Sequence, residues 1–181
     1  MTDGHVSSGR TSFSTFLTGE KASHSLVVTI EKRILDFVNS AQASLDEIEG
    51  ITGSEAPQLV SAEPLQIVRY TQGQGYTSHY DNRAGSQARK ATFMLYLATC
   101  ESGGHTFFPR ARVWNPDSGE EQLCSGIKIA PVKGRCVFFY NIRNGKEDEC
   151  SLHEAMPVVS GDKWIATLWL GHAASSVAQV C

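Results

Sequence analysis

A histidine and an aspartate two positions apart, with a second histidine far along the chain, are the residues of this 181-residue sequence best suited to chemistry. His79 and Asp81 stand at the expected end of a strand, where a period of two points both side chains to one face. His153 lies on a late expected strand and would complete a set of two imidazoles and one carboxylate. Such a set binds non-haem Fe(II) and leaves coordination positions open. The alternative is that both histidines are ordinary polar strand residues.

A lysine follows His153 by ten residues and interrupts an otherwise apolar run. Lys163 begins this run, which contains Trp164 and Trp169 and continues to Leu170, so we expect its ammonium group to be buried. Burying a lysine is costly unless the charge meets an anion. The pattern therefore predicts a site for a carboxylate ligand, such as a dicarboxylate co-substrate. The alternative is a strand-end lysine whose ammonium group reaches water.

One amphipathic helix is expected near the start of the chain, over residues 25–41. Its apolar positions follow the i, i+3, i+4, i+7 spacing of a helix face, at Leu26, Val27, Ile30, Ile34, Phe37 and Val38. Ser25 is the expected N-cap. An apolar stripe of this kind packs on a flat surface, so the helix predicts a sheet that it supports. Residues 46–62 are expected to be a connection.

Short β-type runs follow from Pro64 onward, separated by glycine, proline, asparagine and aspartate. The runs cover residues 65–71, 91–98, 106–108, 126–130, 135–140, 152–159 and 163–170. Many short strands after one helix predict a mainly β chain with helical support (α+β), built as a β-sandwich or a jelly-roll barrel.

Composition and charge narrow the class of protein. The length fits one domain, and 41% hydrophobic residues suffice for a core. The 16 basic and 19 acidic side chains leave a net charge of -3 with no polybasic patch, which argues against nucleic acid as a partner. No apolar run is long enough for a membrane span, and no signal peptide is visible. The five cysteines include no CxxC pair, which disfavours structural zinc, and their odd number rules out complete pairing within the chain.

Several motifs, in the same order, resemble those of prolyl 4-hydroxylases of the collagen and plant cell-wall type. Residues 70–81 (YTQGQGYTSHYD) are similar to a YxxGxxYxxHxD segment, and residues 89–97 to an RxxTxxxYL strand. Residues 103–109 (GGHTFFP) resemble GGxTxFP, and His153 with Lys163 resembles the distal histidine and lysine of that family. The resemblance covers about residues 10–172.

The resemblance implies a single Fe(II)- and 2-oxoglutarate-dependent dioxygenase domain over residues 1–181, built on a double-stranded β-helix (jelly roll). Residues 1–62 would form the N-terminal strand and helix support, and residues 63–172 the jelly-roll core. The family normally has more chain before its Arg-Thr-Ser segment, here residues 10–12, so part of the N-terminal support is expected to be missing. A cysteine of the family near the distal histidine is replaced by Met156, so Cys124 would need Cys136 or Cys150 as a disulfide partner.

The resemblance also implies roles for individual residues. His79, Asp81 and His153 would hold Fe(II), and Lys163 would pair with the distal carboxylate of 2-oxoglutarate. Tyr70, Thr106 and Trp169 would join Lys163 in binding this co-substrate. O2 and ascorbate complete the expected set of cofactors. Trp164 and Trp169 fit as pocket walls, with core packing as their alternative.

A proline-containing peptide or protein is the implied partner, because an extended polyproline segment costs little entropy to bind. The implied substrate-binding residues are Arg10, Ser12, Glu63, Tyr76, Arg89 and His172. The alternatives are a loose terminus for Arg10 and Ser12, an exposed loop for Glu63 and a surface position for His172.

The expected reaction is hydroxylation of prolyl residues at the 4-position, with release of succinate and CO2. A lysine ten residues after the distal histidine, rather than an arginine, favours the prolyl group. The alternatives are a related dioxygenase that acts on another amino acid or a small molecule, a catalytically inactive peptide-binding β-helix, and a cupin-like or lectin-like sandwich. The family often works in the endoplasmic reticulum lumen, but these residues carry no address.

Overall fold

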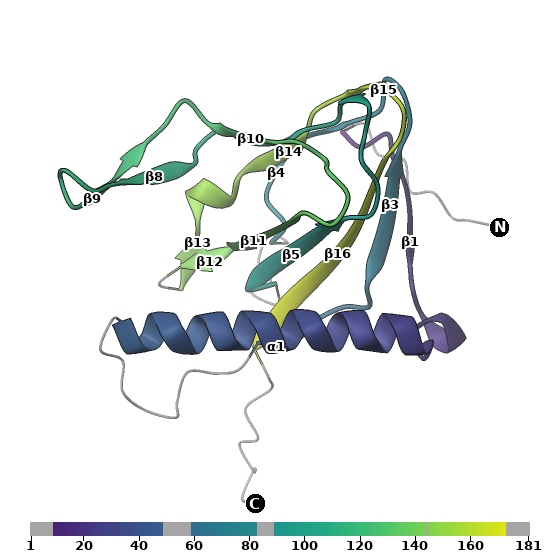
Figure 1. The fold of residues 1–181 in the computed structure, drawn as a ribbon, viewed down its shortest axis with the longest axis horizontal. Helices are drawn as coiled ribbons and strands as arrows, with labels where there is room; N and C mark the ends of the chain where they lie inside the picture. Colours follow the sequence, from purple (N-terminus) through teal and green to yellow (C-terminus); the bar gives the residue numbers. More distant parts are fainter. Residues whose placement is uncertain (1–8, 49–58, 83–88, 144, 173–181) are drawn as a thin grey trace, which may run out of the picture.

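Two antiparallel sheets face each other in the computed structural model, which describes residues 9–48, 59–82, 89–143 and 145–172 (Figure 1). The larger sheet has the strand order β1-β3-β16-β5-β11, and β2 pairs with the far end of β16. Its strands are β1 (Phe13–Phe16), β2 (Leu59–Ser61), β3 (Gln66–Tyr70), β5 (Ala91–Tyr96), β11 (Cys136–Tyr140) and β16 (Lys163–His172).

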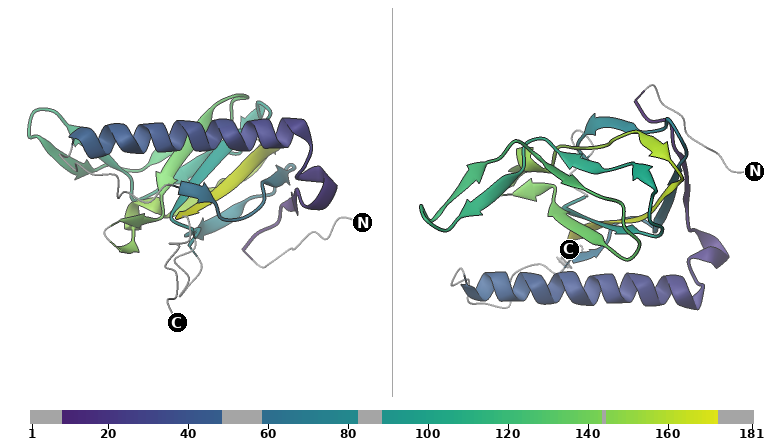
Figure 2. Two further views of the ribbon diagram at one scale, coloured as in Figure 1. Left: turned by 90° about the horizontal axis from the view of Figure 1, so that it is seen from below. Right: turned by 45° about the horizontal axis from the view of Figure 1, so that its top comes forward.

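The smaller sheet has the order β10-β7-β14-β4. Its strands are β4 (Tyr76–His79), β7 (Thr106–Phe108), β10 (Ile127–Ile129) and β14 (His153–Ala155). The strands close around a common interior in the right-hand view of Figure 2, and the helix lies outside it. Two such antiparallel layers form a jelly roll, as the sequence predicted.

Short elements complete the described chain. They are the pair β6 (Ser102–Gly103) and β15 (Val158–Ser160), the hairpin β8 (Arg112–Asn115) and β9 (Glu120–Leu123), the pair β12 (Ile142–Arg143) and β13 (Lys146–Glu147), and the 3-10 turns η1 (Gly19–Lys21) and η2 (Glu149–Ser151). The β8–β9 hairpin projects from the barrel in Figure 1, and its turn at residues 116–119 contains proline, aspartate and glycine, which are typical of turns.

The helix α1 (Ser25–Ile48) begins where predicted and continues past the expected end at residue 41. At its start the Leu26 amide donates to His24 Nδ1 over 3.2 Å. His24 is thus the N-cap. The prediction of Ser25 as the N-cap is wrong because Ser25 is already the first helical residue.

The outer face of the larger sheet packs against α1. Val27, Ile34 and Val38 of the helix are buried in one cluster with Leu168 and Leu170 of β16. The intervening residues of β16 point the other way, into the barrel. Because β16 is buried on both faces, its sequence is a nearly continuous apolar run.

Each predicted β-type run contains at least one strand, but two boundaries differ. The expected strand over residues 152–159 is broken at Pro157, which has no N–H for a ladder; β14 stays in the smaller sheet, whereas β15 pairs with β6. The expected connection over residues 46–62 contains β2, while residues 49–58 lie outside the described residues.

The described cysteines form no disulfide. The free thiols are Cys100, Cys124, Cys136 and Cys150, so the structure contains neither candidate bridge from Cys124. Cys181 lies outside the described residues. In the part of the chain that the structure describes, no helix combines the length and apolar character needed to cross a bilayer.

Candidate active site

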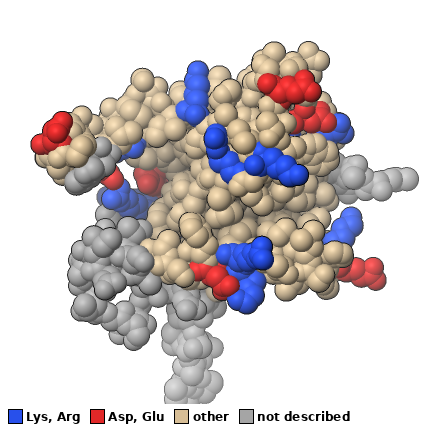
Figure 3. Space-filling model, in the orientation of Figure 1, with Lys and Arg blue, Asp and Glu red and all other residues tan. Residues whose placement is uncertain are grey.

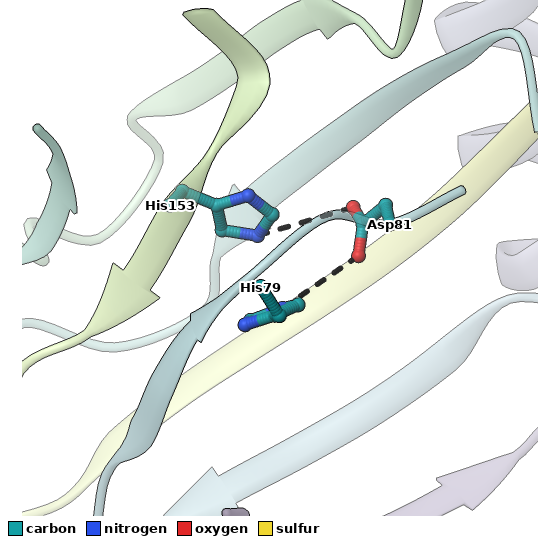
Figure 4. A group of neighbouring side chains, drawn as sticks. All are labelled: His79, Asp81 and His153. Carbon is teal, nitrogen blue, oxygen red and sulfur yellow. Dashed lines mark ion pairs between the residues drawn. The ribbon is translucent and has the colours of Figure 1, made fainter. Parts of the chain in front are cut away.

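The two histidines and the aspartate come together inside the barrel, as predicted. His79 ends β4 and His153 begins β14, and antiparallel pairing places them directly opposite each other. One ligand atom from each of the three residues lies within 4.8 Å of the others. His79 Nε2 is 3.8 Å from Asp81 Oδ1, and His153 Nε2 is 4.0 Å from Asp81 Oδ2 (Figure 4).

Each imidazole is oriented by a backbone carbonyl. His79 Nδ1 lies 2.8 Å from the Thr77 oxygen, and His153 Nδ1 lies 2.9 Å from the Ser151 oxygen. A carbonyl can only accept, so Nδ1 carries the hydrogen and Nε2 presents its lone pair to the cluster. This second contact is the usual support of a metal-binding histidine.

Aromatic rings pack against both imidazoles. Tyr76 stacks on His79 with 3.7 Å between ring centroids, and Phe108 and Phe139 pack at 5.4 and 5.0 Å from the His153 ring. Burial, and secondarily the neighbouring His153, lowers the pKa of His79 to about 4. The imidazole of His79 is therefore neutral near pH 7, which is the form that binds metal.

The orientation of the Asp81 carboxylate has a different cause from the strand alternation that the sequence suggested. Strand β4 ends at His79, and Asp81 lies in a bend beyond it, so strand alternation does not orient the carboxylate. Instead, the Thr92 hydroxyl donates to Asp81 Oδ2 over 2.7 Å, and Arg89 Nη1 donates to the Asp81 carbonyl over 3.1 Å. Both partners come from β5 or the residues just before it.

The inner face of the larger sheet forms the opposite wall of the pocket in four cross-strand layers. Tyr70 pairs with Lys163 in the first layer, and Trp169 pairs with Thr92 in the last. The layers between them are Val68, Ile165 and Tyr96, then Gln66, Thr167 and Met94. The wall thus has Lys163 at one end, an apolar pair of Val68 and Ile165 next to it, and the polar Gln66 and Thr167 farther along. The pocket is partly open to solvent.

Lys163 lies at one end of this pocket and is 1% exposed. Its Nζ donates to Thr106 Oγ1 over 3.2 Å and lies 5.2 Å from the centre of the Tyr70 ring. No ion pair joins Lys163 to a carboxylate among the described residues. Burial lowers the pKa of Lys163 to about 7. Lys163 is therefore a buried group without an acidic partner among the described residues, and the alternative of a lysine that reaches water is wrong.

Tyr96 is a site residue that the sequence analysis missed. Its hydroxyl donates to Thr106 Oγ1 over 2.7 Å, beside Lys163. Burial raises the pKa of Tyr96 to about 12 and also raises the pKa of Tyr70, so both phenols keep their protons. Because Thr106 accepts from Tyr96 and Lys163, its own hydroxyl proton is free for a ligand. Tyr96 belongs to the quoted strand motif, so a signal was present.

Arg10 and Tyr76 line the mouth of the pocket. They form an isolated β-bridge, with the Arg10 guanidinium 5.4 Å from the centre of the Tyr76 ring. Arg10 Nε donates to Ser12 Oγ over 2.8 Å, and Ser12 is 1% exposed. The alternative of a loose terminus is therefore wrong for Arg10 and Ser12.

Glu63 and Arg89 lie behind Asp81 and do not line the pocket. They form an ion pair with each other, and the Arg89 guanidinium stacks 3.6 Å above the Trp169 ring. Glu63 is half-buried in this pair and is not a free loop residue. His172 ends β16, and its side chain lies outside the described residues.

The two tryptophans of β16 have different surroundings. Trp169 lines the pocket, as predicted, and its buried Nε1 has no hydrogen-bond partner among the described residues. Trp164 points to the other side, where the Arg69 guanidinium lies 5.3 Å from its ring centre. The prediction of Trp164 as a pocket wall is wrong because its position in the strand alternation places it outside.

The pocket of this jelly roll has two histidines and an aspartate on one wall and a buried lysine without an acidic partner on the other. This arrangement is typical of non-haem metal oxygenases. Residues 65–171 match the sequence model of the family described as the 2OG-Fe(II) oxygenase superfamily. The chain belongs to this superfamily.

Individual relatives narrow the similarity further. Prolyl 4-hydroxylase 13 of Arabidopsis thaliana is 40% identical over 116 residues, which cover 60% of this chain and 42% of that protein. Prolyl 4-hydroxylase 1 of the same plant is 33% identical over 174 residues, covering 92% and 55%. A crystal structure of a viral collagen prolyl hydroxylase from Paramecium bursaria Chlorella virus-1, in complex with 2OG, is 29% identical with a TM-score of 0.64, covering 91% and 81%. The chain spans about half the length of the curated relatives it matches.

Proposed function

We propose that this protein is an Fe(II)- and 2-oxoglutarate-dependent dioxygenase that hydroxylates prolyl residues at the 4-position in a peptide or protein. The observation that carries the proposal is one pocket with a His79, Asp81 and His153 cluster on one wall and the unpaired Lys163 on the other. The similarity to proteins named prolyl 4-hydroxylases supports the substrate class.

The residues of the cluster fit a bound Fe(II). Two imidazole nitrogens with free lone pairs and one carboxylate are nitrogen and oxygen donors suited to this ion, and they occupy only one side of it. When bound, Fe(II) with O2 supplies the oxidation in which 2-oxoglutarate gives succinate and CO2 while the substrate gains a hydroxyl group. We expect ascorbate to support turnover as a reductant.

The other end of the pocket fits the distal carboxylate of 2-oxoglutarate. Lys163 supplies a buried cation, Thr106 supplies a hydroxyl group beside it, and the Tyr70 ring lies 5.2 Å from the ammonium group. The apolar side chains of Val68 and Ile165 in the layer next to Lys163 suit the two methylene groups of the co-substrate. Binding of the carboxylate would also remove the cost of an unpaired buried ammonium group.

The mouth of the pocket fits an extended peptide. Arg10 and Tyr76 form one side of it. Trp169 lies six residues beyond Lys163, roughly 20 Å along the strand, in the same layer as Thr92. This position supports a role for the unused Trp169 N–H as a donor to a peptide carbonyl, beyond the co-substrate. A polyproline segment offers many such free carbonyl groups.

Succinate formation tests the proposal. Purified protein with Fe(II), ascorbate and 2-oxoglutarate is assayed with and without a proline-rich peptide, and the peptide is analysed by mass spectrometry for an added oxygen atom on proline. We expect peptide-stimulated succinate and a hydroxylated product. Turnover without stimulation by the peptide would indicate another substrate class, and binding of peptide without any turnover would indicate an inactive peptide-binding domain.

Asp81→Ala ties the activity to the cluster. We expect it to abolish succinate formation, because it removes one of three proposed metal ligands. Asp36→Ala is the matched control, since it removes an exposed carboxylate on α1 that forms an ion pair with Lys32. Full activity in Asp81→Ala would refute the site.

A further inference from the structure

The Asp81 carboxylate stands at the end of a buried chain of hydrogen bonds that begins on another strand. Thr92 Oγ1 donates to Asp81 Oδ2 over 2.7 Å, and Asn141 Nδ2 donates to Thr92 Oγ1 over 2.9 Å. Thr92 is 1% exposed and Asn141 is 0% exposed. Water therefore does not compete for these bonds.

The direction of this chain follows from its two ends. An ionised carboxylate can only accept, so the Thr92 hydroxyl must donate to Asp81. The lone pairs of Thr92 are then the acceptor for Asn141, whose amide must present its NH2 group rather than its oxygen. The Asn141 amide thus turns the Thr92 hydroxyl toward Asp81.

The residue at the start of the chain is firmly placed. Asn141 follows the last residue of β11, and its backbone N–H donates to the Lys90 carbonyl over 2.8 Å. Its side-chain Oδ1 is buried without a hydrogen-bond partner among the described residues. An unpartnered buried oxygen costs stability. The hydrogen bond that this side chain contributes is therefore the one that its NH2 group donates to Thr92.

Asp81 needs this support more than the two histidines do. Each histidine belongs to a strand and has its ring fixed by a carbonyl two residues earlier. Asp81 lies in a bend two residues beyond the end of its strand. Within the described residues, its Oδ1 accepts no hydrogen bond and faces His79, while Oδ2, which lies 4.0 Å from His153 Nε2, accepts a hydrogen bond from Thr92.

We propose that Thr92 and Asn141 are positioning residues that hold Oδ2 of Asp81 and so present Oδ1 to the metal as a single ligand atom. The inference rests on the proposed metal site. It explains how one carboxylate binds without occupying a second coordination position, which the co-substrate and O2 need. It also explains why two buried polar groups stand between β5 and β11 where apolar side chains would pack.

Binding of Co(II) to the purified apoprotein tests this inference without turnover. Thr92→Val removes the hydroxyl at nearly constant shape, and Thr92→Ser keeps it. We expect Thr92→Val to weaken Co(II) binding about 10- to 100-fold, the usual effect of losing such a support. We also expect a changed Co(II) visible spectrum, because the carboxylate is then free to bind through both oxygens. Thr92→Ser should stay close to the wild type in both measurements.

A second variant covers the case in which Thr92→Val folds poorly because Asn141 loses its acceptor. Thr92→Val/Asn141→Leu removes both partners together, which is nearly neutral for folding, and should show the same weak binding and altered spectrum. Wild-type affinity and spectrum in either folded variant would overturn the inference. Failure of the wild-type protein to bind Co(II) would instead refute the proposed metal site itself.

Discussion

At the scale of single residues, each proposed metal ligand has a second group that fixes its orientation by a hydrogen bond. The Thr77 carbonyl holds His79, the Ser151 carbonyl holds His153, and Thr92 holds Asp81. Lys163 differs from these ligands, because its only hydrogen-bond partner within the described chain is the neutral Thr106. The cation is thus the residue whose environment changes most when a dianionic co-substrate binds.

Lys163→Ala should raise the KM for 2-oxoglutarate. Truncating one member of a buried charge pair costs about 2–5 kcal/mol, which corresponds to a loss of affinity of roughly 30-fold or more. Initial rates of succinate formation over a range of 2-oxoglutarate concentrations measure it. Lys128→Ala, which changes an exposed lysine of β10, is the control and should leave this KM unchanged. An unchanged KM in Lys163→Ala would contradict its role.

Trp169→Phe should weaken binding of the peptide rather than of the co-substrate. The change removes the indole N–H, and losing one partner of a buried hydrogen bond costs about 1–3 kcal/mol. We therefore expect a higher KM for a proline-rich peptide and a nearly constant KM for 2-oxoglutarate. The opposite pattern would place Trp169 against the co-substrate, as the sequence resemblance suggested. Both constants come from the succinate assay.

The residues that sequence reasoning found and missed differ in where their partners lie. Type and spacing marked His79, Asp81, His153 and Lys163 as candidates, and the resemblance to prolyl 4-hydroxylases then favoured a metal and co-substrate site over ordinary polar residues. Thr92 and Tyr96 are ordinary strand residues, and their roles arise only from side chains brought close by the pairing of distant strands. Asn141 lies in a stretch that suggests only a turn, and nothing in its type indicates a role at the site.

At the scale of elements, the two faces of β16 link the support to the site. Leu168 and Leu170 pack toward α1, whereas Lys163 and Trp169 face the pocket. This strand was predictable because its apolar run is long. The strands β8 and β9 were not, because the residues of β9 are all exposed and show no apolar alternation.

Packing of α1 on the sheet should be worth a measurable part of the stability. Ile34 is 5% exposed in the cluster beneath the sheet, so Ile34→Ala should lower the free energy of unfolding by about 2–4 kcal/mol. Leu26 is 60% exposed on the same helix, so Leu26→Ala is the matched control and should cost less than about 0.5 kcal/mol. Urea unfolding measures both. Equal losses in the two variants would mean that α1 is not held by this face.

At the scale of the whole molecule, the described residues include two buried cations, and Lys163 lacks the acidic partner that Arg89 has in Glu63. Figure 3 shows lysine and arginine side chains spread over the surface, where water solvates them. Lys163 lies inside the barrel, and burial lowers its pKa from the ordinary 10.5 to about 7. The free protein therefore carries a cost at its ligand site, a common trade of stability for function.

This cost should make the stability depend on pH with a definite sign. Below about pH 7 both the folded and the unfolded chain protonate Lys163, and the folded state bears the full cost of the buried ammonium group. Between about pH 7 and 10.5 the unfolded chain binds more protons at this residue than the folded one, so the free energy of unfolding rises with pH. Above that range both forms are neutral and the contribution no longer changes.

Lys163→Met isolates this contribution, because the apolar side chain has a similar length and no charge. The difference in unfolding free energy, wild type minus Lys163→Met, should rise between pH 7 and 9.5 by roughly 1.4 kcal/mol per pH unit at most. The subtraction cancels the contributions of the other titrating groups. The raised pKa of Tyr96 lowers the free energy of unfolding only at pH values above the ordinary tyrosine pKa, so it does not affect this range. Urea unfolding of both proteins at several pH values measures the difference. A flat difference would mean that the buried ammonium group is already neutralised inside the free protein, and the pocket would then lack the unpaired cation that a dicarboxylate needs.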